Sequence, residues 1–131
     1  MNILTTPMFA AAALTAIAGL ALAQASNVKR IDLQRNDLSI PGREAVQAIV
    51  EIAPGTTAAK HSHPGEEIIY VLEGTLVYEI DGRPPIALKA GDVLFIPHGA
   101  IHSATNIGSG RGAELATYVV EKGKPLITPA R

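Results

Sequence analysis

Residues 61–72 decide the fold predicted for this chain, and they read HSHPGEEIIYVL. The second half of the stretch, from Glu67 to Leu72, carries the β-branched and aromatic side chains that are typical of a β-strand. Residues two apart on a strand point to the same face, so His61, His63 and Glu67 can all point to one side. The stretch therefore predicts a strand with three polar side chains gathered at its beginning.

A fourth polar side chain, His102, follows the Pro97-His98-Gly99 turn that ends the apolar run from Val93 to Ile96. If this run lies beside the strand of Glu67, all four side chains converge. Imidazole nitrogens and carboxylate oxygens are the ligands that borderline divalent metals favour, and four protein ligands leave one or two positions open to water or substrate. The sequence therefore predicts a metal centre formed by His61, His63, Glu67 and His102.

Short apolar runs separated by turn residues occupy the rest of the chain after residue 23, and none has helical periodicity. We expect one short edge strand within 31–40 and a ligand-bearing connection at 56–65. Further strands are predicted at 44–52, 67–72, 75–80, 86–89, 92–96, 101–106 and 113–121. The pattern predicts an all-β fold, a single small antiparallel sandwich or barrel around one cavity of ligand size.

The first 23 residues carry no charged side chain and end in Ala21-Leu22-Ala23, a small-x-small pattern that signal peptidase recognises. We expect residues 1–23 to be a cleaved signal peptide and the protein to be periplasmic or secreted, without stable membrane insertion after cleavage. The segment lacks the basic residue that usually opens a signal peptide, so an uncleaved membrane anchor is the alternative. The organisation predicted beyond it is an N-terminal arm (24–42), a β-barrel (43–121) and a C-terminal tail (122–131).

The composition narrows the classes of function. At 131 residues the chain is one domain, and its 11 basic and 12 acidic side chains are nearly balanced, which gives no case for a nucleic-acid partner. There is no cysteine, so the domain has no disulfide and any metal site must use His and carboxylate ligands. A modest all-β core without disulfides favours association, and we expect a homodimer.

Two multi-residue motifs resemble those of the cupin superfamily, and they match at every specified position. The first runs Gly55, five residues, His61-x-His63, three residues, Glu67, six residues, Gly74. The second runs Gly91, five residues, Pro97-x-Gly99, two residues, His102, three residues, Asn106. Together the motifs cover the core of the expected barrel and leave the arm and tail unaccounted for.

The resemblance implies a jelly-roll barrel and supports the same four metal ligands. The ion could be iron, manganese, nickel, zinc or copper, because first-row metals overlap in their preference for such ligands. Cupins commonly pair by sheet packing or by exchange of N-terminal strands, which in this chain would involve residues 31–40.

Resemblance to the quercetin-dioxygenase-like group of small single-domain cupins implies an enzyme acting on a small molecule. Substrate would chelate the metal through adjacent oxygens, and Glu67 would stay a ligand or swing away to accept a proton. One alternative is a metal-dependent lyase or isomerase in which a tyrosine or Glu66 moves the proton. Cupin lyases that cleave dimethylsulfoniopropionate carry a catalytic tyrosine where this chain has Ile69, which disfavours that activity. The other alternative is a non-enzymatic protein that binds a metal or a small molecule.

Weaker expectations concern the remaining polar and aromatic residues. Glu66 is expected at the rim of the site and His98 at most at its mouth. Arginines near turns are expected to be exposed, although they could steer an anionic substrate; these are Arg43, Arg83 and Arg111. Core packing or a dimer face is expected for the strand aromatics Tyr70, Tyr78, Tyr118 and Phe95. Strand alternation predicts an apolar cavity drawn from Val50, Ile52, Ile69, Val71, Phe95 and Leu115.

Overall fold

Ten β-strands make up the fold of residues 27–131, the part of the chain that the computed structural model describes. In chain order they are β1 (Val28–Asp37), β2 (Arg43–Ile52), β3 (Thr57–Ser62), β4 (Gly65–Glu73), β5 (Thr75–Ile80), β6 (Ile86–Lys89), β7 (Val93–Ile96), β8 (His102–Asn106), β9 (Gly112–Glu121) and β10 (Thr128–Pro129). Within the described range there is no helix long and apolar enough to cross a membrane. The all-β prediction is confirmed, whereas the predicted signal peptide (1–23) lies outside the described residues.

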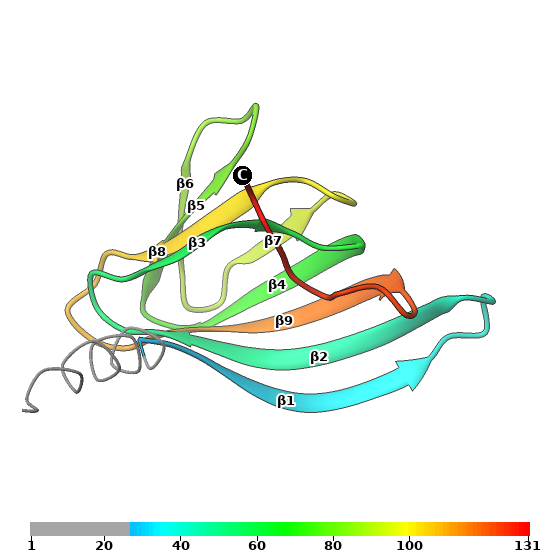
Figure 1. Cartoon of the computed structure of the whole chain (residues 1–131). Helices are drawn as coiled ribbons and strands as arrows, with labels where there is room; N and C mark the ends of the chain where they lie inside the picture. The colour runs from blue at the N-terminus through cyan, green and yellow to red at the C-terminus, as the bar shows by residue number, and fades with distance from the viewer. Residues whose placement is uncertain (1–26) are drawn as a thin grey trace, which may run out of the picture.

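The strands form two five-stranded antiparallel sheets that face each other (Figure 1). The first sheet has the order β1-β2-β9-β4-β7, and the second has the order β10-β3-β8-β5-β6. Neighbours in each sheet are mostly far apart in sequence, so the chain passes repeatedly from one sheet to the other. This arrangement is the jelly roll that the sequence predicted.

The space between the sheets is filled by alternate residues of the strands. On β4, Glu67, Ile69 and Val71 are buried while the residues between them are partly or fully exposed. The largest cluster of buried apolar side chains is made by both sheets and comprises Ile52, Ile69, Val71, Leu76, Tyr78, Ile80, Leu88, Ile96 and Ala104. A smaller cluster lies between β2 and β9 and comprises Val46, Ala116, Tyr118 and Val120.

The segment expected as a connection, 56–65, instead contains strand β3. Its backbone pairs with β8 on one side and with β10 on the other. The strand was hidden in the sequence because most of its side chains are polar or small and only partly buried, which leaves no apolar alternation to recognise. Because β3 is paired along both edges, the backbone at His61 is held in a fixed position.

The predictions that Leu115 of β9 and Phe95 of β7 face the cavity were wrong. Leu115 and Phe95 lie on the outer face of the first sheet, and Phe95 is 54% exposed. The inner face of β9 carries Glu114 instead, a buried carboxylate that a pattern of apolar and polar residues assigns to solvent. Val50 and Ile69 do line the cavity, while Ile52 and Val71 belong to the apolar core.

Asn106 ties the end of β8 to two other segments. Its side chain is fully buried, and its Nδ2 donates to the carbonyls of Ile52 and Gly110 at 2.8 and 2.9 Å. Its Oδ1 accepts from the N–H of Gly108 at 2.9 Å. These bonds close the turn before β9 onto the end of β2, so the role of this motif residue is structural.

Replacing Asn106 by alanine removes hydrogen bonds to three backbone groups, of which one bond is buried and two are partly buried. We expect Asn106→Ala to lower the free energy of unfolding by roughly 3 kcal/mol in chemical denaturation. Asn36→Ala is the matched control, because Asn36 is exposed on β1 and bonds only to the side chain of Gln34. A loss no larger than that of the control, about 0.5 kcal/mol at most, would contradict this role.

Candidate metal centre

The four predicted ligands come together between the two sheets. His61 on β3 and His102 on β8 are directly opposite each other in the second sheet. His63 follows the end of β3, and Glu67 projects from β4 in the facing sheet. The chain crosses between the sheets within this short stretch, and this places His63 and Glu67 against the other two imidazoles.

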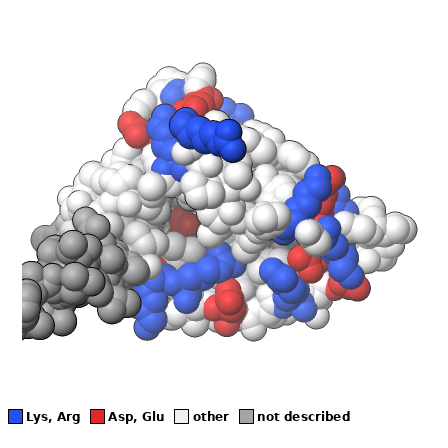
Figure 2. All heavy atoms as spheres, viewed as in Figure 1, with Lys and Arg blue, Asp and Glu red and all other residues white. Residues whose placement is uncertain are grey.

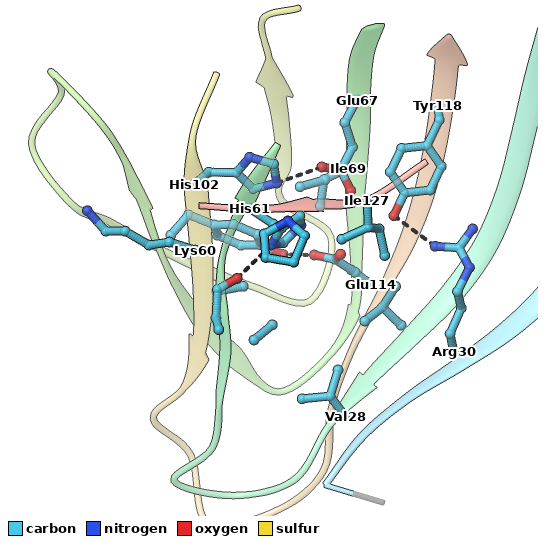
Figure 3. A pocket seen from close by; sticks show the side chains of 16 residues that line it. Val28, Arg30, Lys60, His61, Glu67, Ile69, His102, Glu114, Tyr118 and Ile127 are labelled. Atoms are coloured by element: carbon cyan, nitrogen blue, oxygen red, sulfur yellow. Dashed lines mark hydrogen bonds and ion pairs between the residues drawn. The ribbon is translucent and has the colours of Figure 1, made fainter. Parts of the chain in front are cut away.

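The geometry is that of a compact cluster. One ring nitrogen from each of His61, His63 and His102 lies within 4.8 Å of the others. The Oε2 atom of Glu67 lies 3.1 Å from Nε2 of His63 and 3.0 Å from Nε2 of His102 (Figure 3). The three imidazole nitrogens therefore form one group of potential ligand atoms, and the carboxylate of Glu67 contacts two of the three rings.

The backbone holds all three rings in the same tautomer. The Nδ1 atoms lie 2.6 to 2.9 Å from backbone carbonyl oxygens, those of Ala59 for His61, Leu126 for His63 and Ala100 for His102. A carbonyl can only accept, so Nδ1 carries the proton in each ring and Nε2 of the neutral ring keeps its lone pair. This is the arrangement by which metal-binding histidines are oriented.

Two buried atoms at the centre of the cluster have no hydrogen-bond partner in the described part of the chain, Nε2 of His63 and Oε2 of Glu67. Buried polar atoms are costly when unpaired, and here both are acceptors that converge on one point. A divalent cation would satisfy both of them together with the other imidazoles. The donor set, three nitrogens and one oxygen, also fits borderline metals such as zinc, iron and nickel.

In the metal-free site, the carboxylate of Glu67 and the imidazoles shift one another's pKa values. Burial alone would raise the pKa of Glu67, but the adjacent imidazoles of His102 and His63 outweigh burial and lower it to about 2. Burial lowers the pKa of His61. Burial would lower the pKa of His102, but its contact with Glu67 and the bond to the Ala100 carbonyl together outweigh burial and raise it. Glu67 therefore carries a negative charge although its side chain is almost fully buried.

The cluster opens onto a cavity of about 270 Å³ between the sheets, near the lower end of the range for small-molecule sites, roughly 300–1,000 Å³. Figure 2 shows the hollow on this face of the molecule, with an acidic side chain at its base. Most of the wall is apolar and is formed by Val28, Val50, Ala58, Ala59, Ile69, Ala104, Ile127 and Pro129. The polar lining residues are Arg30, Lys60, His61, Glu67, Tyr78, His102, Glu114 and Tyr118.

Several of these polar residues were missed in the sequence. Glu114 is buried and accepts a short hydrogen bond from the hydroxyl of Tyr78. Burial, together with the negative charge of Glu67, raises the pKa of Glu114 to about 8, so this side chain is largely protonated at neutral pH. The ring of Tyr118 packs against His63 with 4.7 Å between ring centroids. Tyr118 lies two residues after Ala116, so strand alternation places both on the buried face of β9. This alternation was the signal in the sequence that could have located Tyr118.

The tail (122–131) also contributes to the site, which the sequence did not indicate. β10 pairs with β3 at Thr128 and Pro129, and Ile127 and Pro129 line the cavity. The carbonyl of Leu126 is the one that fixes the ring of His63. The tail therefore closes one side of the cavity and orients a candidate ligand.

Other residues considered in the sequence lie away from the cluster. Glu66 is on the opposite face of β4 from Glu67, and His98 is exposed; neither lines the cavity. Arg111 is engaged by Glu51 and Glu73 on the outside. Arg43 and Arg83 are likewise absent from the lining, so the arginine in the cavity is a different one, Arg30.

Comparison with known proteins identifies the region that contains this site. The sequence profile of the Cupin domain matches residues 48–121. An oxalate-binding protein of Thermotoga maritima is 40% identical over 63 residues, which cover 47% of this chain and 51% of that protein. A dimethylsulfoniopropionate lyase of Ruegeria pomeroyi is 36% identical over 55 residues, which cover 42% of this chain and 27% of the lyase.

Among solved structures, an uncharacterised conserved protein with a double-stranded β-helix domain from Klebsiella pneumoniae superposes with a TM-score of 0.67 at 22% identity. The match covers 80% of this chain and 85% of that one. The chain spans about half the length or less of the two curated relatives, so what it shares with them is the domain.

We expect the chelator-treated protein to bind one equivalent of Co²⁺ or Zn²⁺ in calorimetry, because four donor atoms already converge. His102→Ala should weaken this binding at least about 100-fold by removing one of them. His98→Ala is the matched control, since His98 is exposed and outside the cluster. Equal affinities for His102→Ala and the wild type would rule the cluster out as the metal site.

Proposed function

This chain belongs to the cupin domain family, and from that premise we propose that it is an exported enzyme that oxidises a small chelating substrate with a divalent metal. The ligands we assign are His61, His63, Glu67 and His102. Export is supported by the uncharged residues 1–23 and their small-x-small ending. The oxidation is of the kind carried out by the quercetin-dioxygenase-like cupins.

One observation carries the proposal. Lone pairs from three fixed imidazoles and a buried carboxylate converge at the end of a largely apolar cavity. A divalent metal held there supplies Lewis acidity and, if it is redox-active, oxygen chemistry. The apolar wall excludes water, which strengthens electrostatic interactions at the site and limits side reactions.

Glu67 is the residue to which we assign a catalytic role. Its carboxylate is ionised and lies between His63 and His102, so it can remain a ligand or accept the proton of a substrate hydroxyl. Glu114 and the hydroxyl of Tyr78 are hydrogen-bonded to each other in the same cavity, and both carry protons at neutral pH. The hydroxyl proton of Tyr78 is engaged by Glu114, so the proton of the Glu114 carboxylic acid is the one that can be donated to a substrate oxygen.

The oxalate-binding relative supports a substrate that presents adjacent oxygen atoms, because oxalate is a ligand of that kind. A second candidate is a metal-dependent lyase or isomerase, favoured by the proton-bearing groups Tyr78, Tyr118 and Glu114 around the cavity. Ile69 still disfavours cleavage of dimethylsulfoniopropionate, since an apolar side chain lines the cavity at that position. Binding without turnover is the third candidate.

Oxygen uptake separates these candidates. We expect iron- or nickel-loaded protein to consume oxygen with an enediol or flavonol substrate, and Glu67→Gln to slow uptake at least about 100-fold because the carboxylate charge is lost. The control is His98→Ala, which should retain the wild-type rate. Substrate conversion under strict anaerobiosis would assign the protein to the lyase and isomerase class, and binding without conversion in either condition would make it a binding protein.

We also propose that the protein is a homodimer that pairs through the outer face of the first sheet. Directly opposed residues of all five strands form an apolar row across that face, Ile31, Ile49, Leu115, Tyr70 and Val93. Val93 is 66% exposed, and Phe95 beside it is 54% exposed. A sheet with apolar residues on both faces is ordinarily covered on both.

Light scattering of the protein after the predicted cleavage should give twice the chain mass. We expect the double variant Val93→Lys, Phe95→Lys to raise the dimer dissociation constant at least about 30-fold, because two charges enter an apolar contact. Ile86→Lys is the control, since Ile86 is 43% exposed but lies on the other sheet. A monomeric wild type, or equal effects of the variants, would contradict the proposed face.

A further inference from the structure

Arg30 brings a positive charge into the cavity that contains the candidate metal centre. It projects from β1, the edge strand of the first sheet, and lines the same cavity as His61 and His102 (Figure 3). Its side chain is only 25% exposed. Most arginines of this chain lie outside the cavity walls, so this placement requires an explanation.

The guanidinium of Arg30 has donors to spare. Its Nε donates to Asp32 at 2.8 Å, and its Nη1 donates to the hydroxyl of Tyr118 at 3.2 Å. Its Nη2 is buried and has no hydrogen-bond partner among residues 27–131. A guanidinium has five N–H bonds in a fixed plane, and a buried unpaired donor is costly. An acceptor from outside the protein would complete the set.

Tyr118 sets the spacing between Arg30 and the metal centre. The guanidinium carbon of Arg30 lies 5.1 Å from the centroid of the Tyr118 ring, and this ring lies 4.7 Å from that of His63. One aromatic ring therefore separates the two, and contact with it holds the guanidinium in place. A ligand that reached from the metal centre to Arg30 would be about one ring long.

Apart from Glu67, which belongs to the candidate metal centre, the other charged groups around the cavity neutralise Arg30 only in part. Asp32 pairs with it from the outside and is 81% exposed. Glu114 is largely protonated at neutral pH because burial raises its pKa to about 8. Lys60, the other cation of the lining, is paired with Asp81 at the exposed edge. Outside the candidate metal centre, an anion in the cavity would therefore find its strongest fixed partner in Arg30.

We propose that Arg30 anchors a carboxylate of the substrate, which makes the substrate a small organic acid. One end of this acid carries the adjacent oxygens that meet the metal centre, and the other end, about one aromatic ring away, carries the carboxylate. The inference rests on the function proposed above and specifies its substrate. A carboxylate matches the planar donor fork of arginine, and the apolar walls suit the ring or chain between the two ends.

Binding to the protein loaded with Zn²⁺ tests this assignment without requiring turnover. The probes are 3,4-dihydroxybenzoate and catechol, which share the adjacent hydroxyls and differ in the carboxylate. In calorimetry we expect the wild type to bind the acid at least about tenfold more tightly, as a charge-assisted hydrogen bond requires. Arg30→Met keeps the apolar stem and should abolish this preference while leaving catechol binding unchanged.

Two further variants control for effects on the preference that do not come from the guanidinium of Arg30. Arg35→Met removes an exposed arginine from the same strand and should keep the preference for the acid. Arg30→Lys keeps the charge without the fork and should retain part of the preference. Equal affinities of the wild type for the two probes, an undiminished preference in Arg30→Met, or no binding of either probe would overturn the assignment. Acid binding that depends on Arg30 but persists without metal would support it while counting against the proposed metal chemistry.

Discussion

The direct pairing of His61 with His102 across β3 and β8, opposite Glu67 on the facing sheet, is the constraint on which the site depends. Backbone pairing fixes where the two imidazoles stand, and sheet packing fixes the distance to the carboxylate. Each ring is then oriented by its own backbone carbonyl. The site is thus built from rigid elements, which is what a preorganised metal centre requires.

A large part of this could be predicted from the sequence. The spacing of His61, His63 and Glu67 and the turn before His102 were enough to indicate a cluster, because two motifs specify both the ligands and the turns that aim them. Strand β3 could not be recognised, since its pairing with β8 and β10 is a tertiary feature that no local pattern contains. The inner face of β9 was not predicted for a related reason. A glutamate normally faces solvent, and only the tertiary packing around Glu114 buries it.

The cavity has two chemically different regions. At the metal centre, donors converge and are fixed by the backbone. Around Tyr118 the groups are a guanidinium, phenols and a protonated carboxylic acid, which are suited to recognise oxygen atoms of a ligand. The C-terminal tail joins the two regions, because Leu126 orients His63 while Ile127 and Pro129 form the wall. The cavity lining therefore draws on β1 and the tail, which lie outside the two motifs.

A crystal structure of the protein loaded with a single divalent metal tests the central claim most directly. The account predicts one ion about 2.0–2.3 Å from Nε2 of His61, His63 and His102 and from a carboxylate oxygen of Glu67, with a position open toward the cavity. An ion bound through Nδ1 atoms, or bound elsewhere on the protein while these four side chains keep their present contacts, would contradict it.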